Sequence, residues 1–437
     1  MPRTRIISQT KAVYVSPTGL LGTTYGGSGI PMSGLAPTQL SKVDTFSFDI
    51  DLAGSRMDIR EFGQLNRVGA VRMSEIGATC SIGYYLNNGE NEHNLGLNIR
   101  GMTGASVPTS QFISGQLTED IIKRERNLYV LTTQDGVDAF DGVTFSGSRG
   151  LHDVISFGNA SLSSYTANFA VGEIPRADVE FECSNVAFAT GRSSGILNPS
   201  LNRSLATIAD TGRAILLAPN TGDTFASDVL KPGDVSVLFS NNTVANLGGV
   251  ILSGMHIQSA SIEVPLTRTP IERLGNELPF AKPLEFPINV TCSINGLVTD
   301  YAQGDIAGIL TGCAFGGSTN ITIDVKDRCN NANTAMRWIL QNAVLDSQNF
   351  SIGLDDSETV DLVFSAQIAG ALSTTAGLFM SGAYNGIGVI GSDADRPLFI
   401  SGVWWLIINV KFNKTLLDWP GKVLLFAIMC NILYARR

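Results

Sequence analysis

The chain has 437 residues, of which 44% are hydrophobic and 16% are charged, a composition typical of a folded protein and not of a disordered one. Its 39 acidic residues outnumber its 30 basic ones, and the net charge of −9 without a sustained Lys/Arg run argues against a nucleic-acid-binding protein. Two interpretations of the acidity stay open: it repels nucleic acid that passes the protein, or it only keeps the protein soluble.

Residues 1–40 are predicted to form an N-terminal arm. The first residues, MPRTRIISQTKAVYVS, lack an apolar core, so we expect no secretory signal. The 6 cysteines show no CxxC pair, which favours reduced thiols in a cytosolic setting.

Alternating apolar residues predict strands from residue 45 onwards. In TFSFDIDL (45–52) every second residue is apolar, from Phe46 to Leu52. A period of two residues indicates a strand with one buried and one wet face. The 46 glycines, together with Ser, Thr and Asn between the apolar runs, predict many short strands joined by turns.

One segment, SGQLTEDIIKRER (114–126), predicts a short helix instead. Thr118 is placed to cap its N-terminus, Glu119 and Asp120 follow in the first turn, and basic residues stand near its end. Most of this segment has no counterpart later in the chain, so we expect the helix once.

Residues 191–250 are predicted to be a linker with strand-like runs, RAILLAP and VSVLFS. Within it, GRSSG (191–195) matches the G-x-S-x-G pattern of hydrolases. That pattern needs a helix after the serine, whereas ILNPSLN with its proline follows here, which indicates a loop.

A repeat relates the two sides of this linker. TCSI occurs at 79–82 and again at 291–294, an offset of 212 residues. The same offset matches further pairs without a gap: Cys80 with Cys292, Asp51 with Glu263, Arg56 with Arg268, and Gly63 with Gly275. At shorter offsets NLYV meets NITI and NASLSS meets NAVLDS, in the same order. We interpret this as a tandem duplication, with copies at 41–190 and 251–370 and both matched cysteines facing a core.

Residues 371–437 are predicted to form a C-terminal extension with no counterpart in either copy. Its apolar runs, LFISGVWWLIIN and VLLFAIMCNILYARR, are each shorter than the roughly 20 residues of a spanning helix. Buried strands or a short core helix are therefore favoured over a membrane anchor.

Residues typical of catalysis are scarce. The 3 histidines lack metal-ligand spacing, and GCAFGGST (312–319) lacks the lysine of a phosphate-binding loop. NNGENEHN (87–94) and DADR (393–396) lack the spacing of a calcium loop and are interpreted as turns. Cys313 and Cys329 bracket a segment that a hairpin would close, yet a disulfide there is the less favoured interpretation. We expect no enzyme activity, no metal and no cofactor.

Three segments of the duplicated unit carry a resemblance: the long strand FPINVTCSING, the NAxLxS strand, and the closing strand VDLVFSAQI. With them the unit resembles the tube-forming domain of tailed bacteriophages, and the stretch 155–186 is similar to virion structural proteins of that group. This resemblance implies a mainly β fold of two tandem β-sandwiches with a short flanking helix, packed edge to edge into a ring around a hollow centre.

The resemblance also implies a function: a virion protein, assembled in the host cytoplasm, whose stacked rings contact other tail proteins and form a tail tube for double-stranded DNA. Because two copies are fused, three chains would close a ring that otherwise needs six. The sequence leaves open another ring such as a terminator or collar, an adhesin-like surface protein, and a carbohydrate-active enzyme, which would need a pair of carboxylates.

Asp51 and Glu263 are the predicted channel-lining residues. Basic side chains on the wall would attract phosphate, so acids such as these, together with Asp49, or a neutral lining of Ser, Thr and Asn, would let DNA pass. The alternation equally fits a wet face on the outside of the ring.

Overall fold

The structure is a computed structural model. It describes residues 11–17, 37–51, 56–73, 77–97, 99–101, 125–132, 153–190, 199–202, 207–208, 217, 230, 232–240, 255–275, 278–279, 281–299, 318–326, 334–352, 357–368 and 376–382. These residues are nearly all in antiparallel strands, with one short α-helix among them, which confirms the predicted mainly β class.

The first half of the chain is organised around one long strand, β9 (Asp153–Ala170). The C-terminal part of β9 pairs with β10 (Arg176–Cys183), and the sheet continues through β6 (Gly77–Tyr85) to β3 (Val43–Asp51). The order β3–β6–β10–β9 therefore forms a first group of four strands.

The N-terminal part of β9 belongs to a second group. It lies between β8 (Glu125–Thr132) and β11 (Asn185–Thr190), and β8 in turn pairs with β1 (Lys11–Pro17), which pairs with β2 (Thr38–Gln39). Phe48 of β3 meets Phe157 of β9 edge-on at 5.4 Å between ring centroids, so the inner sides of the two groups pack on each other.

The second half repeats this arrangement around β18 (Thr334–Ser351). Its C-terminal part pairs with β19 (Thr359–Gln367), and the sheet continues through β16 (Asn289–Leu297) to β15 (His256–Pro265). The order β15–β16–β19–β18 is thus the same as β3–β6–β10–β9.

The N-terminal part of β18 lies between two other strands, β17 (Thr319–Lys326) and β20 (Gly377–Gly382). β17 also pairs with β14 (Val235–Phe239), and β20 pairs in parallel with β7 (Ile99–Gly101), a strand from the first half. Phe239 of β14 and Phe364 of β19 pack with 6.1 Å between ring centroids, so two groups of strands face each other here as well.

The register of the strands agrees between the two halves at single residues. Phe181 lies opposite Cys80 in the first half, and Phe364 lies opposite Cys292 in the second. Both long strands also contain a bulge at the same place: Phe181 and Phe364 lie just beyond a shift in pairing, opposite Leu162 and Leu345.

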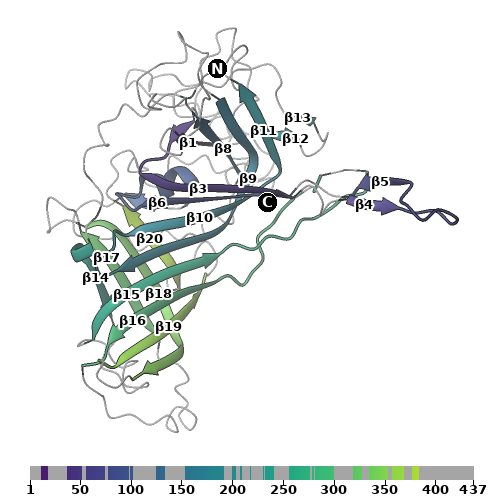
Figure 1. Cartoon of the computed structure of the whole chain (residues 1–437). Coiled ribbons are helices and arrows are strands. Elements are labelled where there is room, and N and C mark those ends of the chain that lie inside the picture. Colours follow the sequence, from purple (N-terminus) through teal and green to yellow (C-terminus); the bar gives the residue numbers. More distant parts are fainter. Residues whose placement is uncertain are drawn as a thin grey trace, which may run out of the picture. The chain divides into compact units, whose positions relative to one another are not determined.

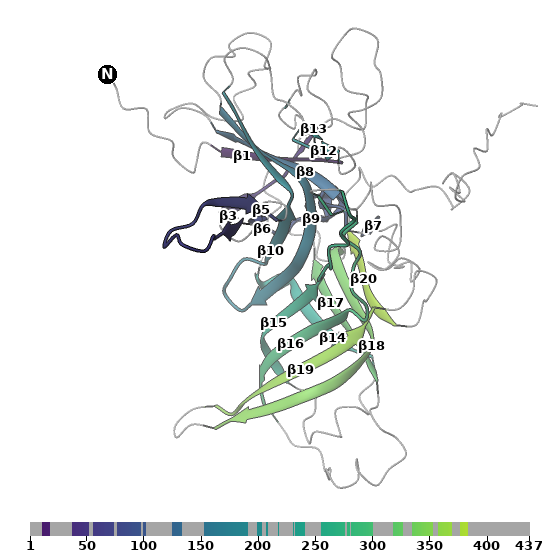
Figure 2. The same cartoon turned by 90° about the vertical axis from the view of Figure 1, so that its right-hand side faces the viewer.

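One antiparallel pairing joins the halves. Residues 164–170 of β9 pair with residues 259–265 of β15, so the two groups of four strands become a continuous sheet of eight, β3–β6–β10–β9–β15–β16–β19–β18. In Figure 1 its strands follow one another from purple to yellow-green, and Figure 2 shows β15, β16 and β19 side by side. We call this pairing of β9 with β15 the internal seam.

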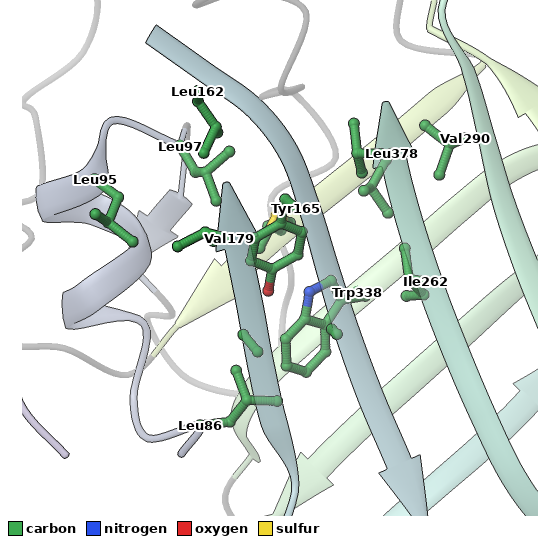
Figure 3. Packing of buried hydrophobic residues seen from close by; sticks show 14 of the residues in the cluster. Leu86, Leu95, Leu97, Leu162, Tyr165, Val179, Ile262, Val290, Trp338 and Leu378 are labelled. Carbon is green, nitrogen blue, oxygen red and sulfur yellow. The ribbon is translucent and has the colours of Figure 1, made fainter. Parts of the chain in front are cut away.

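Apolar side chains from both halves form one core beneath the eight-stranded sheet. Trp338 of β18 is fully buried and packs edge-on against Phe169 of β9 at 5.2 Å between ring centroids. Figure 3 shows the Trp338 indole and the Tyr165 hydroxyl directed toward each other between the strands. Burying an apolar side chain of this kind contributes roughly 1.5–3 kcal/mol, so the contact stabilises the packing of β18 against β9.

The helical predictions need correction. Residues 114–124 of the predicted helix lie outside the described residues, and Glu125 and Arg126, its last two, begin strand β8. The helix that is present, α1 (Glu90–Leu95), lies where we predicted a turn. Glycines with positive φ, Gly89 at 91° and Gly96 at 98°, bound it, because glycine adopts this conformation without a steric penalty.

The strands also extend beyond the predicted copies at 41–190 and 251–370. β1 comes from the predicted N-terminal arm, β14 from the predicted linker and β20 from the predicted C-terminal extension, and all are hydrogen-bonded into the sheets. Residues 383–437, including the apolar runs of the extension, lie outside the described part of the chain, as do Cys313, Cys329 and GRSSG.

Candidate functional site

The eight-stranded sheet has one buried face and one polar face. On β6 and β16 alternate residues such as Ile82 and Ile294 point into the core, and the residues between them point outward. Directly opposed residues of antiparallel strands lie on the same side, so the pairings identify the outward residues on all eight strands. We call this outward side the polar face.

The polar face carries mainly hydroxyls, amides and carboxylates. Hydrogen bonds cross it between neighbouring strands: Ser47 and Ser81 approach at 2.8 Å, and Asn168 donates to Asp178 at 3.3 Å. The side chain of Asn295 donates to Asp361 in the second half in the same way. The acidic residues at outward positions are Asp49, Asp51, Asp178, Glu180, Glu182, Glu263 and Asp361.

Among the described residues, Arg176 is the one arginine or lysine at the outward positions where these eight strands pair with one another. Its guanidinium donates to Asp178 at 2.7 Å and lies 3.7 Å from Asp44. The hydrogen bond to Asp178, with the charges of Asp178 and Asp44, raises the pKa of Arg176. Two carboxylates therefore accompany the one cation, and the face as a whole is negative.

The structure places both predicted lining residues on the polar face, although not at equivalent positions. Glu263 lies opposite Thr291, whereas Asp51 lies opposite Gly77. The residue opposite Thr79, which corresponds to Thr291, is Asp49. The sequence match of Asp51 with Glu263 therefore differs by two residues from the match that the strand register gives. Alternation with a period of two cannot reveal such a shift, because a shift of two residues leaves each side chain on the same face of the strand.

The matched arginines and glycines lie in two hairpins. Strands β4 (Arg56–Ile59) and β5 (Gly69–Arg72) pair Arg56 with Arg72 and Ile59 with Gly69. Isolated bridges join Arg268 with Leu284 and Ile271 with Ala281, each 212 residues later. Gly63 and Gly275 have φ of 90° and 87°, so both hairpins turn through a glycine in the left-handed region.

Both hairpins expose apolar side chains. Phe62 and Leu65 at the tip of the first hairpin and Leu274 at that of the second are fully exposed. Charged contacts differ between the two hairpins: Asp58 accepts from Arg67 at 3.0 Å, while the guanidinium of Arg268 donates to the carbonyl of Lys282 at 3.1 Å. Apolar tips without burial in the chain are typical of contact surfaces.

The matched cysteines are buried, as predicted. Cys80 and Cys292 face the core, and the Sγ atom of Cys80 lies 3.7 Å from that of Cys183. This contact and burial raise the pKa of Cys80, and burial raises the pKa of Cys292 to about 12. Both thiols are therefore protonated packing residues.

Sequence reasoning missed a buried carboxyl on α1. Glu92 is fully buried, and burial raises its pKa to about 7 even though the Tyr84 hydroxyl donates to its Oε1 at 3.0 Å. Asn91 fixes the same helix from its other side by donating to the carbonyl of Ser41 at 2.7 Å. The weak signal for α1 was the glycine at each end of ENEHNL.

The part of the chain that the structure describes holds no group of three or more His, Cys, Asp or Glu side chains arranged to bind a metal. Among the same residues, no helix is both long and apolar enough to cross a membrane. The polar face and the two hairpin tips are the candidate functional surfaces.

No protein-family model matches the sequence, and comparison with curated proteins gives no match either. One of the solved structures similar to part of the chain is the cryo-EM structure of the anti-feeding prophage baseplate, 6-fold symmetrised. The similarity has 13% sequence identity and a TM-score of 0.21, and it covers 34% of this chain and 91% of that one. At this level it carries no argument about function.

Proposed function

We propose that the chain is a structural virion protein of a tailed phage, which self-assembles into stacked rings that form the tail tube, a conduit for double-stranded DNA. The observation that carries the proposal is the continuous sheet of eight strands, in which two topologically equivalent halves share one polar face. The resemblance of the duplicated unit to tube-forming domains suggests that this sheet forms the wall of the tube.

The internal seam supports ring assembly. It joins two equivalent units through different edges, β9 of one and β15 of the other, and such a heterologous contact repeats until it closes or forms a filament. One chain supplies two units, so three chains would supply the six units of a ring.

The composition of the polar face supports the conduit. DNA binds a protein surface chiefly when Lys and Arg neutralise its phosphates and release counterions. On the polar face, the carboxylates of strands such as β10 and β15 repel phosphate instead, and Arg176 is already paired with Asp178. DNA would slide along such a wall without being held.

Electron microscopy of the purified, concentrated chain tests assembly, and a reconstruction of the particles tests the direction of the polar face. We expect hollow rings or tubes with Asp49, Glu180 and Glu263 on the inner wall. Particles without a central opening, or a lumen rich in Lys and Arg, would contradict the conduit.

A charge-reversal pair tests the electrostatic role in solution. Glu180→Lys with Glu263→Lys replaces two carboxylates of the polar face by two positive charges, and we expect assembled particles to retain double-stranded DNA at low salt. The matched control, Glu272→Lys with Glu285→Lys, changes the same charge on the second hairpin and is expected to retain none in the lumen. Equal retention by both variants would argue against a lumenal polar face.

A further inference from the structure

Two buried cysteines lie side by side in the first half of the chain. Cys80 of β6 and Cys183 of β10 are each 2% exposed, and their Sγ atoms are 3.7 Å apart. Their strands pair antiparallel, and Cys80 lies opposite Phe181, two residues before Cys183. The two cysteines are therefore diagonal neighbours on the core side of the sheet, although 103 residues separate them in the sequence.

The second half has the same strands but not the same pair of thiols. Cys292 of β16 corresponds to Cys80 and faces Phe364 of β19. Two residues after this phenylalanine, at the position of Cys183, the chain has Ala366, which is 4% exposed. Because an alanine fills this place in the second core, packing alone does not explain the cysteine at position 183.

Cys183 is placed where the strand ladder leaves room for it to approach Cys80. Cα atoms of diagonal neighbours lie roughly 7–8 Å apart, whereas a disulfide spans up to about 7 Å without movement of the backbone. Cys183 is the last residue of β10, and the pairing of β10 with β9 ends one residue earlier, at Glu182. Among the described strands Cys183 pairs with β6 alone, so a small shift of this strand end brings the two sulfur atoms into bonding distance.

We propose that Cys80 and Cys183 are an oxidisable dithiol, which closes to a disulfide between β6 and β10 when the chain meets a peroxide. Hydrogen peroxide oxidises one thiol to a sulfenic acid and releases one molecule of water. The second thiol then attacks this sulfur, the S–S bond forms, and the sulfenic oxygen leaves with the thiol proton as a second water. The two cysteines together lose two electrons, which the O–O bond of the peroxide accepts.

The surroundings of the pair determine how fast it reacts and what it forms. The contact with Cys183, together with burial, raises the pKa of Cys80, so its thiol reacts slowly and stays reduced where oxidants are scarce. Once one sulfur of the pair is oxidised, the other already lies 3.7 Å away and captures it. Cys292 has Ala366 at the corresponding position, so it is expected to remain a thiol.

The disulfide would tie two strands of the first half together covalently. It closes a long loop that contains α1, β7, β8 and β9, and such a link lowers the conformational entropy of the unfolded chain. A chain that passes from a reducing to an oxidising compartment would gain this stabilisation. Both sulfur atoms belong to one chain, so the link does not depend on assembly into rings or tubes.

Peptide mapping by mass spectrometry tests the site. The full-length chain is reduced, treated with dilute hydrogen peroxide, unfolded in urea, alkylated with iodoacetamide and digested. We expect the peptides of Cys80 and Cys183 to be joined, and Cys292 to be recovered as an alkylated thiol. In the control Cys183→Ala, Cys80 should be recovered unlinked. Absence of the 80–183 link in the native chain, or a link of Cys80 to another cysteine, would overturn the proposal.

Ala366→Cys is a matched variant that builds the same pair in the second half. Like Cys183, position 366 lies diagonal to a core cysteine, and its strand pairs there with β16 and no longer with β18. Peroxide should therefore form a 292–366 disulfide in this variant in addition to the 80–183 link. A 292–366 link without an 80–183 link would show that peroxide reaches the core and that the native pair does not react, which contradicts the proposal.

Thermal unfolding gives an independent readout of the link. Oxidation should raise the unfolding midpoint of the native chain by about 5 °C, because the disulfide restricts the unfolded state. The midpoint of Cys183→Ala should not rise on the same treatment. Both proteins contain the same methionines, so methionine oxidation affects them equally. A native chain that carries the 80–183 link and shows no rise in midpoint would overturn its stabilising role.

Discussion

The backbone N–H of Asn159 donates to the side-chain oxygen of Asn127 at 3.2 Å. Asn342 makes the same contact with Asn320 at 3.0 Å in the second half. Asn159 and Asn342 have φ of 50° and 58°, a left-handed conformation that asparagine tolerates better than most residues. Each pair lies where the pairing of a long strand is interrupted by a bulge. The same bulge occurs in both halves and needs an asparagine on each of two strands. This explains why NLYV resembles NITI and why NASLSS resembles NAVLDS.

The two asparagine pairs differ in burial, which predicts unequal effects of truncation. Asn127 is buried and also donates to Ser200 at 2.7 Å, so Asn127→Ala leaves buried polar groups without partners and should lower the free energy of unfolding by about 1–3 kcal/mol. Asn320→Ala, in a more exposed pair, should cost about 1 kcal/mol or less. Urea unfolding followed by circular dichroism measures both, and equal losses would contradict this account.

Glu92 predicts a pH dependence of stability. Its pKa is about 7 in the folded chain against an ordinary value of 4.5, so the unfolded chain loses this proton first as the pH rises. Stability is therefore unaffected by Glu92 below about pH 4.5, falls between 4.5 and 7, and then stays lower, by on the order of 3 kcal/mol.

Glu92→Gln should remove this loss, because a glutamine oxygen can still accept from Tyr84 and carries no charge to desolvate. We expect the variant to gain stability over the native chain at pH 8 and not at pH 4. Tyr165, which faces Glu92 from β9, keeps its proton throughout because burial raises its pKa well above 10. The titration of His93 is common to both proteins, and Glu173→Gln is the control at an exposed carboxylate. A Glu92→Gln variant that gains no stability over the native chain at pH 8 would contradict the assignment.

The buried thiols predict protection from alkylation. Burial and raised pKa values keep Cys80 and Cys292 protonated, and only the thiolate reacts. In the folded chain at pH 8, iodoacetamide should modify these two cysteines at least about a hundredfold more slowly than in urea. Peptide mapping by mass spectrometry reads each site separately, and fast modification of Cys292 in the native protein would show that the core is open there.

Local patterns were sufficient for several strands. The alternation in TFSFDIDL and the repeat of TCSI predicted β3, β6 and β16 with the correct buried face, because one side of each strand packs on a core that selects apolar residues. Local patterns did not show that β1, β14 and β20 belong to the sheets, because these strands are held by partners far away in the sequence.

The sequence predicted which residue types form the polar face, but it did not predict which strands lie side by side in it. Acids and hydroxyls at alternate positions indicated a wet face, yet the seam between β9 and β15 depends on a pairing across some 95 residues that no local pattern contains. The match of Asp51 with Glu263 was displaced for the same reason, the lack of information on strand pairing. A sequence that alternates with a period of two fits equally well after a shift of two residues. α1 was missed because six residues between glycines are too few to show helical periodicity.

The hairpin tips predict a contact that contributes to assembly and not to folding. Phe62 and Leu65 are exposed by 106% and 110%, so Phe62→Ser with Leu65→Ser removes no buried area, and the thermal unfolding midpoint should stay unchanged. In the proposed tube the edges of the sheet close each ring, which leaves the apolar tips for contacts between rings. We therefore expect the variant to form single rings and few stacks in electron micrographs. Val171→Ser, at an exposed turn after β9, is the control and should stack normally; full-length tubes from the double variant would rule out the tips as the stacking contact.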